Sequence, residues 1–278
     1  MTRPPALLRL EHQLQQLGPV AVATSGGVDS MTLAALAHRL DPHCEIYHAL
    51  SPAVPAQATA RVQHYARQEH WQLHLLNAGE INDPRYVENP VNRCYFCKTN
   101  LYGSISNETK LVVVSGTNTD DLGDYRPGLI AASEHGVRHP YVDAGVSKAE
   151  LRDIARYLGL DDLHDLPAAP CLSSRVTTGI AIDATLLPVI NTAEQLLWTQ
   201  LQSHLPLQGV RCRIKPEQVT IQIQTRAVID PQASYAINAI NLIRDLFVDS
   251  GHQGQVKHID IEPYRRGSAF LIDTLAVN

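Results

Sequence analysis

Apolar residues in the first half of the chain form short continuous runs that alternate with stretches at helical spacing. Val20–Thr24 is such a run, and apolar side chains recur after it at the intervals of one helix face, at Met31, Leu33, Leu36 and Leu40. The succession then repeats, with strands expected at Glu45–Leu50, Gln72–Leu76 and Lys110–Ser115, helices at Ala56–Glu69 and Ser147–Leu158, and His139–Val142 completing the unit. Strands that alternate with helices predict an α/β fold with a parallel sheet.

The pattern changes beyond about residue 180. We expect a helix at Ala184–Leu201, strands at Val210–Ile214, Val219–Ile223 and Val256–Ile261, and a helix within Pro231–Asp249. This order predicts a smaller C-terminal α+β domain. The proline- and serine-containing segment Leu166–Thr178 is the expected junction, so we predict one domain over 1–178 and a second over 179–278.

Composition and charge narrow the class of protein. The chain has 278 residues, of which 44% are apolar, enough for a sizeable core, and its net charge is −5. No apolar run reaches the roughly 20 residues that cross a bilayer, and we see no secretory signal at the N-terminus, so we expect no membrane association and a cytoplasmic location. Five cysteines, an odd number, favour reduced thiols over a disulfide framework. Because Lys and Arg form no block, we expect no nucleic-acid partner.

The strongest local signal is the loop Ser25-Gly26-Gly27-Val28-Asp29-Ser30, between the first strand and the first helix of the alternating pattern. Its glycines allow a close approach of the backbone to an anion, and the helix that follows directs its N-terminal N–H groups toward that anion. No lysine ends the loop, so it is not the Walker A arrangement. It resembles instead the PP-loop of enzymes that cleave ATP between the α- and β-phosphates, although a plain glycine turn remains the alternative.

A second polar segment follows the expected strand Lys110–Ser115. It runs from Gly116 to Gly128 and carries three carboxylates within five residues, together with Asn118, Asp121 and Arg126. Ligands of open α/β sheets bind at the carboxyl ends of strands, and Mg²⁺ prefers oxygen ligands. We therefore expect this segment, through Gly116, Asn118, Asp121 and Arg126, to contribute to the nucleotide and Mg²⁺ site, the alternative being a solvated turn.

Cys94 and Cys97, three residues apart, share one face of a helix or a turn, a common half of a metal or cluster site. Cys171 is the candidate third ligand, brought near by the fold because we expect both Cys97 and Cys171 to follow strand ends. The alternatives are a redox or sacrificial use of Cys171, a zinc site, or structural thiols. Cys44 and Cys212 flank expected strands, which is typical of packing residues.

The order of these motifs resembles one family. The PP-loop, then Asn92-Arg93-Cys94-Tyr95-Phe96-Cys97-Lys98, then the segment from Gly116 to Gly128, then Pro170-Cys171-Leu172-Ser173-Ser174-Arg175, is similar to the LarE family of ATP-dependent sulfur transferases. The resemblance covers roughly residues 10–275. It implies a PP-loop domain, with the adenine nucleotide alpha hydrolase-like fold, and a smaller C-terminal domain.

The resemblance also implies a reaction. Family members adenylate a carboxylate of a pyridinium mononucleotide and replace the AMP with sulfur, in the synthesis of a nickel-pincer cofactor. Asp29 would then help to place Mg²⁺, and the loop serines, Ser25 and Ser30, would hold pyrophosphate. Members with one cysteine at the position of Cys171 give up its sulfur, whereas three-cysteine members are thought to hold a [4Fe–4S] cluster. The sequence departs from the family at Thr220-Ile221-Gln222, where members show Arg-Ile-Glu.

Four further residues are candidates for substrate or nucleotide contacts. Arg211 and Arg213 alternate along one expected strand, so their side chains leave the same face as a possible phosphate clamp, the alternative being an exposed sheet face. Ser174 and Arg175 directly follow Cys171, and we expect them to bind the α-phosphate or AMP.

Other functions remain open at this point. A tRNA-thiolating PP-loop enzyme shares the ATP and cluster chemistry but calls for a basic RNA-binding domain, and an amide-forming ligase needs no set of three cysteines. A non-catalytic module that binds ATP or stores a cluster is the third alternative. The expected partners are a nucleotide-like carboxylate and sulfide or another sulfur donor, and we expect a homo-oligomer.

Overall fold

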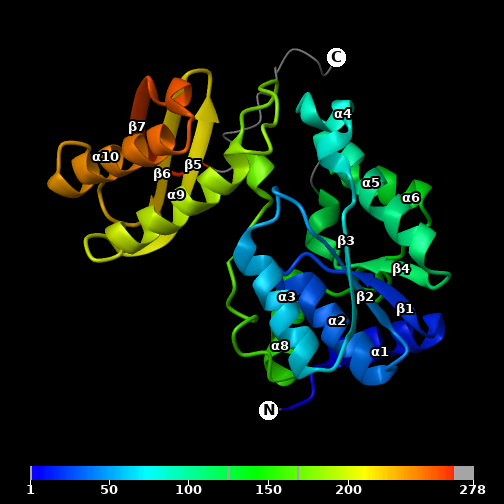
Figure 1. The fold of residues 1–278 in the computed structure, drawn as a ribbon. Helices are drawn as coiled ribbons and strands as arrows, with labels where there is room; N and C mark the ends of the chain where they lie inside the picture. Colours follow the sequence, from blue (N-terminus) through cyan, green and yellow to red (C-terminus); the bar gives the residue numbers. More distant parts are fainter. Residues whose placement is uncertain (1, 124–125, 168, 266–278) are drawn as a thin grey trace. The chain divides into compact units, whose positions relative to one another are not determined.

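The computed structural model describes residues 2–123, 126–167 and 169–265, and the chain divides into two compact units. One unit comprises Met1–Tyr86 with Asn92–Ala169, and the other comprises Val87–Val91 with Pro170–Asn278. Figure 1 shows the elements of both units. The border lies at Ala169–Pro170, whereas we expected it after residue 178, because the segment that follows Cys171 pairs with the second unit through a bridge between Val176 and Ile214.

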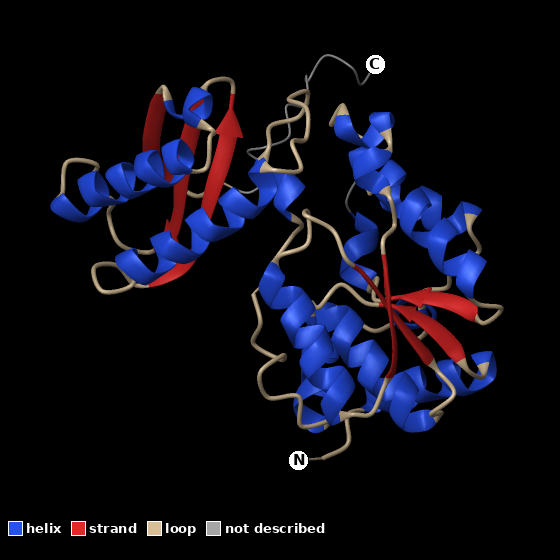
Figure 2. Cartoon of the chain, in the orientation of Figure 1, coloured by secondary structure: helices blue, strands red, loops and turns tan. Residues whose placement is uncertain are grey.

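The first unit contains a four-stranded sheet in the order β3-β2-β1-β4, with every neighbouring pair parallel (Figure 2). The predicted α/β class with a parallel sheet is therefore confirmed. The elements of this unit are α1 (Pro5–Leu17), β1 (Val20–Ala23), α2 (Val28–Leu40), β2 (Glu45–Ala49), α3 (Ala56–Gln68), β3 (Gln72–Leu76), α4 (Pro84–Val87), α5 (Arg93–Glu108), β4 (Val112–Ser115), α6 (Pro127–Glu134), α7 (Pro140–Asp143) and α8 (Lys148–Tyr157), with 3₁₀ turns at Glu80–Asn82 and Thr119–Gly123.

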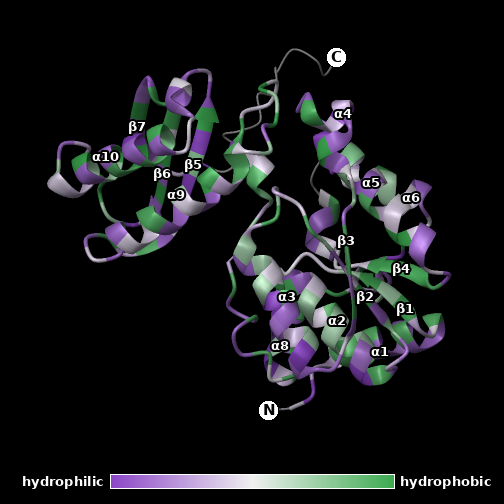
Figure 3. Cartoon of the chain, viewed as in Figure 1, coloured by the Kyte–Doolittle hydropathy of each residue, from purple (hydrophilic) through white to green (hydrophobic). Residues whose placement is uncertain are grey.

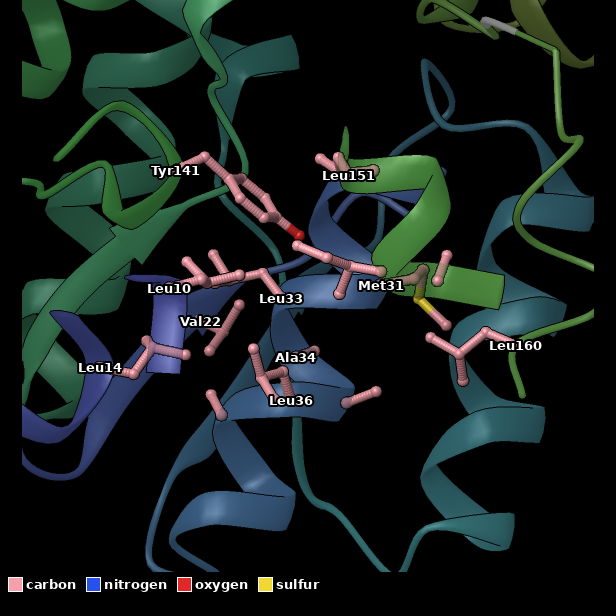
Figure 4. Close-up of a cluster of buried hydrophobic side chains, with 14 of the residues drawn as sticks. Leu10, Leu14, Val22, Met31, Leu33, Ala34, Leu36, Tyr141, Leu151 and Leu160 are labelled. Carbon is pink, nitrogen blue, oxygen red and sulfur yellow. The ribbon is translucent and has the colours of Figure 1, made fainter. Parts of the chain in front are cut away.

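Buried side chains of β1 alternate between two hydrophobic clusters, as the period of two in a strand requires. Val20 and Val22 pack into one cluster with α1, α2, α3 and α8, and Figure 4 shows part of it. Ala21 and Ala23 pack into the other, with residues of α5 and α6. Helices thus cover both faces of the sheet, and the hydropathy colouring of Figure 3 marks β4 as strongly apolar. Among the described helices, none has the length and apolar character needed to cross a membrane.

The register of the sheet determines where the two polar segments meet. β1 and β4 are neighbours, and Ala23 at the end of β1 pairs with Ser115 at the end of β4. The loop that follows β1 and the segment that follows β4 therefore leave the same edge of the sheet side by side. This is the edge at which open α/β sheets bind ligands.

The second unit is a small α+β unit, as predicted. Its sheet has the order β5-β6-β7, with β5 antiparallel to β6 and β6 parallel to β7. Its elements are a 3₁₀ turn at Leu172–Arg175, α9 (Leu186–Leu201), β5 (Leu207–Lys215), β6 (Gln218–Thr225), α10 (Ser234–Asp249), a 3₁₀ turn at Gln253–Val256, and β7 (His258–Pro263).

Asn89 joins the short segment Val87–Val91 to the rest of the second unit. Its side chain is fully buried, and its amide donates hydrogen bonds to the carbonyls of Thr177 and Ile180, both at 2.9 Å. Its backbone has a φ of 55°, a left-handed conformation that asparagine tolerates better than most residues. The carbonyl of Asn89 also accepts from the N–H of Gly179 at 2.9 Å. These contacts make Val87–Val91 an integral part of that unit.

Candidate functional site

The loop after β1 has a conformation that requires glycine at Gly26. Its φ is 80°, and a Cβ atom there would lie 2.7 Å from the carbonyl oxygen of Ala58 in α3. Within the loop the N–H of Ser25 donates to the Ser30 hydroxyl at 3.0 Å, and the two serine hydroxyls lie 3.2 Å apart. Two hydroxyls are therefore held together at the start of α2, where we expected a pyrophosphate group.

The N-terminus of α2 is arranged to receive an anion. Its N-cap residue, Gly27, makes no side-chain capping bond, so no side chain of the cap occupies the N–H groups of the first turn. These N–H groups and the positive end of the helix dipole favour negative charge at this position. Gly116 lies against the same turn, since a Cβ atom on it would come within 2.8 Å of the Ser30 nitrogen. The predicted residues Gly26, Gly27, Ser30 and Gly116 are thus brought together.

Asp29 faces a lysine that the sequence analysis missed. The ammonium of Lys148 lies 2.5 and 2.6 Å from the two carboxylate oxygens of Asp29, and the Asn118 amide donates to the same carboxylate at 3.3 Å. Lys148 is the first residue of α8, directly after Ser147, and the capping box predicted between Ser147 and Glu150 is present. The capping box thus determines where α8 starts and sets Lys148 on its first turn, opposite the loop.

The segment after β4 is held by its own polar groups. The N–H of Asn118 donates to Asp121 at 3.1 Å, and the N–H of Asp120 donates to the Asn118 side chain at 3.1 Å. Asp121 also forms an ion pair with Arg126 at 2.7 Å. Asp124 and Tyr125, which we had included in this segment, lie outside the described residues.

The carboxylates expected to hold Mg²⁺ each face a cation in the structure. Asp29 is paired with Lys148, and Asp121 with Arg126. Among the described residues, no group of three or more His, Cys, Asp and Glu side chains has an arrangement that would hold a metal ion. The role expected of Asp29 and Asp121 in placing Mg²⁺ therefore stays a prediction.

His48 fixes the loop to the neighbouring strand and helix. This buried side chain at the end of β2 lies 2.8 Å from the Thr24 carbonyl through Nδ1 and 2.9 Å from the Thr59 hydroxyl through Nε2. Burial lowers the pKa of His48, so the neutral ring is favoured. A neutral ring that donates to Thr24 and accepts from Thr59 satisfies both contacts.

Cys94 and Cys97 lie in the first turns of α5, and both are partly exposed. The helix places them on one face, as the spacing predicted, and two such thiolates suit half of an iron–sulfur site. The expectation that Cys97 follows a strand end was wrong, because it lies inside a helix that begins at Arg93. Cys171 belongs to the second unit.

The loop that carries Cys171 is fastened by Arg175. Arg175 is 3% exposed, and its guanidinium forms a two-pronged ion pair with Glu194 of α9 at 2.9 and 2.8 Å. It also donates to the carbonyls of Pro170 at 2.6 Å and Cys171 at 3.3 Å, while the Ser174 hydroxyl donates to the Cys171 carbonyl at 2.7 Å. Burial favours the neutral form, but Glu194 raises the pKa of Arg175.

Ser174 and Arg175 were expected to bind the α-phosphate or AMP. In the structure both donate hydrogen bonds to the backbone of the Cys171 loop, and Arg175 also binds Glu194. These contacts hold the loop that presents Cys171, and the expected binding of the α-phosphate or AMP stays a prediction.

Arg211 and Arg213 both lie on β5, as predicted, but they are not on an exposed face. The Arg213 Nε donates to the Gln222 side chain at 2.9 Å, and its Nη1 donates to the carbonyl of Ser174. Arg211 lies 4.0 Å from Glu194. Burial and the nearby Arg175 lower the pKa of both Arg211 and Arg213. Arg175 and Arg211 thus lie beside the partly buried carboxylate of Glu194, and Arg213 follows two residues along β5.

The remaining cysteines are packing residues, as expected. Cys44 and Cys212 are buried, and burial raises the pKa of both thiols. A buried thiol with a raised pKa is a poor nucleophile.

Comparisons with known proteins place the chain among several relatives. No family model matches the chain. An uncharacterized protein of Synechocystis sp. is 35% identical over 78% of this chain and 84% of its own length. The chain belongs to the family of that protein. At 27% identity it is also similar to an uncharacterized protein of Methanocaldococcus jannaschii, over 69% of this chain and 75% of that protein.

A more distant relative carries a functional name. The pyridinium-3,5-bisthiocarboxylic acid mononucleotide synthase of Lactiplantibacillus plantarum is 27% identical over 66% of this chain and 68% of its own length. That protein is a LarE enzyme, so the predicted relationship to the LarE family is supported. Together with the α/β fold, it supports an enzyme of the PP-loop sulfur-transferase class.

Proposed function

We propose that the protein is an ATP-dependent sulfur transferase, which adenylates a substrate carboxylate and then replaces the AMP with sulfur. The observation that carries this proposal is the edge of the first sheet, where Gly26, Gly116 and the uncapped start of α2 form an anion-binding loop beside the Asp29–Lys148 pair. The distant similarity to a LarE synthase gives the sulfur chemistry its support.

In the first step the β- and γ-phosphates of MgATP bind to the N–H groups at the start of α2 and to the hydroxyls of Ser25 and Ser30. A carboxylate oxygen of the substrate attacks the α-phosphorus, and the bond from that phosphorus to the bridging oxygen breaks. Pyrophosphate leaves with the bonding electrons, and the products are an acyl adenylate and pyrophosphate. Lys148 holds the Asp29 carboxylate, and in this proposal its ammonium offsets the negative charge that accumulates on the phosphates.

In the second step a sulfur nucleophile attacks the acyl carbon. A carbon–sulfur bond forms, the bond to the AMP oxygen breaks, and AMP leaves with the electron pair. We propose that Cys94, Cys97 and Cys171 would hold a [4Fe–4S] cluster, which when bound would carry the sulfide that is transferred. The alternative is that the Cys171 thiolate attacks and later loses its own sulfur, as its Cα proton is removed and the Cβ–S bond breaks.

The substrate in this proposal is a nucleotide-like carboxylate, with a pyridinium biscarboxylate mononucleotide as the first candidate. Arg211 and Arg213 would bind its phosphate, because both alternate along β5 beside the Arg175 guanidinium and a guanidinium suits phosphate. We propose that the first unit binds ATP and that the second binds the substrate and mediates homo-oligomer formation. Gln222, where the family shows Glu, is bound to Arg213 and Glu262, so this part of the site is less acidic here.

The experiment uses protein purified without oxygen. Pyrophosphate and AMP release are measured with MgATP and pyridinium-3,5-biscarboxylic acid mononucleotide, with and without sulfide, and a thiocarboxylate is sought by mass spectrometry. We expect pyrophosphate and AMP to be released in equal amounts. Absence of pyrophosphate release would favour the non-catalytic module, sulfur found in added tRNA would favour the tRNA-thiolating enzyme, and an amide formed with ammonia would favour the ligase.

A further inference from the structure

Arg61 of α3 lies beside the loop that we assign to ATP, and no motif pointed to it. Its Nη1 donates to the carbonyl of Gly26 at 2.7 Å, and the side chain is partly buried. α3 lies close to the loop at this position, since a Cβ atom on Gly26 would fall 2.7 Å from the Ala58 oxygen. Ala58 and Arg61, three residues apart, lie on the same face of the helix.

The turn of α3 that carries Arg61 is fixed by contacts with the rest of the first unit. Thr59, on the same turn of α3, binds His48, which in turn binds the Thr24 carbonyl at the start of the loop. Val62 and Tyr65 anchor the next part of the helix in the core of the first unit. These contacts fix the turn of α3 that carries Arg61, and from there its guanidinium reaches the Gly26 carbonyl.

The positive charge of Arg61 forms no ion pair with a carboxylate in the described part of the chain. Asp29 is paired with Lys148 and Asp121 with Arg126, whereas no described carboxylate pairs with Arg61. A guanidinium has five N–H donors, and the Gly26 carbonyl accepts only one of them. A cation beside the start of a helix is also disfavoured by the helix dipole. Both features become favourable once an anion binds between α2 and α3.

We propose that Arg61 binds the terminal phosphates of ATP and stabilises the leaving pyrophosphate. The inference rests on the proposed function, and it adds a catalytic residue from α3 to the groups of α2. As the bond between the α-phosphorus and the bridging oxygen breaks, negative charge accumulates on the pyrophosphate. Arg61 offers this charge two adjacent donors in the fork geometry that suits phosphate.

The test compares Arg61→Gln, which keeps a donor but loses the charge, with Arg61→Lys, which keeps the charge. Arg67→Gln is the matched control, because Arg67 lies on the same helix and is exposed. Binding of magnesium pyrophosphate and of AMP is measured by calorimetry. We expect Arg61→Gln to weaken pyrophosphate binding roughly 10- to 100-fold, the loss of one charged contact, with AMP binding unchanged. Arg61→Lys should recover most of this loss, and Arg67→Gln should match the wild type.

A purely structural role would have a different signature. If Arg61 only shapes the loop, Arg61→Gln should speed amide hydrogen exchange over residues 25–30 without any nucleotide, and pyrophosphate binding should not depend on the charge at position 61. That result, or wild-type pyrophosphate binding by Arg61→Gln, would overturn the inference while the proposed function stands. A wild-type protein that binds neither AMP nor pyrophosphate would overturn both.

Discussion

The Lys148 ammonium lies 2.5 and 2.6 Å from the two carboxylate oxygens of Asp29, although 119 residues separate them in the chain. The pair links the first turn of α8 to the first turn of α2. Because the Asp29 side chain accepts both bonds, its orientation toward the loop depends on a residue from the far end of the unit. The arrangement of the loop after β1 thus depends on α8 and not on the sequence of the loop alone.

The first prediction concerns this pair. Asp29→Ala should abolish pyrophosphate release, and Lys148→Met should reduce its rate roughly 100-fold, because each removes a charged group from the site of developing charge. Both variants should unfold at nearly the wild-type temperature, since the two side chains are each about 30% exposed. Asp153→Asn, on the exposed face of α8, is the control. Normal turnover by Asp29→Ala would exclude the PP-loop assignment.

The second prediction concerns Gly116. Gly116→Ala should destabilise the protein by about 1–3 kcal/mol, because the added methyl group would lie 2.8 Å from the Ser30 nitrogen and push β4 and α2 apart. Gly103→Ala is the control. A Cβ atom on Gly103 would meet only the His135 ring, at 3.5 Å, and Gly103 lies inside α5, where alanine favours the helix. Urea unfolding measures both. Equal stability of the two variants would show that the close approach is not maintained in solution.

The third prediction concerns the ion pair between the buried Arg175 and the partly buried Glu194. Glu194→Ala should cost about 3–5 kcal/mol of unfolding free energy, because it leaves the Arg175 charge buried without its carboxylate. The double variant Arg175→Met with Glu194→Leu should regain a large part of that loss. Glu217→Ala, at the exposed pair with Lys257, should have almost no effect.

Glu194→Ala should also change how Cys171 reacts. Arg175 holds the carbonyls of Pro170 and Cys171, so loss of its partner should loosen that loop and accelerate alkylation of Cys171 by iodoacetamide. Mass spectrometry locates the alkylated thiol. Unchanged alkylation in a destabilised variant would mean that the pair stabilises the second unit without positioning Cys171.

The fourth prediction concerns pH. Burial holds the pKa of His48 and His139 below the ordinary value of 6.5. The unfolded chain therefore binds protons that the folded protein does not, so stability should be complete above pH 6.5 and should fall as the pH drops below it. Unfolding free energies measured from pH 8 to pH 5 test this, and His48→Gln should reduce the slope. A flat profile for the wild type would contradict the lowered pKa of these two rings.

The fifth prediction separates the two sources of sulfur. If Cys94, Cys97 and Cys171 hold one cluster, replacing any of them by serine should remove iron and activity alike. If Cys171 is consumed, Cys94→Ser and Cys97→Ser should keep most of the first turnover, and the product enzyme should lack one sulfur at Cys171. Iron and sulfide analysis of oxygen-free protein measures the first outcome, and intact-protein mass measures the second.

The central strands of the sheet were predictable because β1 and β4 are nearly continuous apolar runs. β1 and β4 lie within the predicted ranges, and the glycine loop and the segment after β4 meet because both follow strand ends. By contrast, the apolar pattern did not predict α5. This helix has few buried residues, among them Tyr102 and Ile105, so the period of its apolar residues is weak. His139–Val142 contributes to the helix α7, because Pro140 occupies the first helical position there.

The residues that sequence reasoning missed act across long separations in the chain. Lys148, Arg61 and Glu194 occupy ordinary positions in their own helices, and only packing brings them to Asp29, Gly26 and Arg175. Their partners lie on other elements, so no local motif marks them. A capping box indicated where α8 begins, but the residue opposite its first turn depends on the fold of the whole unit.

The path of the chain limits how this protein can be divided or recombined. The backbone passes from one unit to the other at residues 86–87, 91–92 and 169–170. A fragment that begins at Pro170 would leave the carbonyls of Thr177 and Ile180 without the Asn89 amide that binds them. A chimera made by a single crossover at Pro170 would take its C-terminal part from another relative. It would therefore separate Val87–Val91 from the rest of the second unit. A chimera would be expected to fold only if it also inherited Val87–Val91 from the same parent.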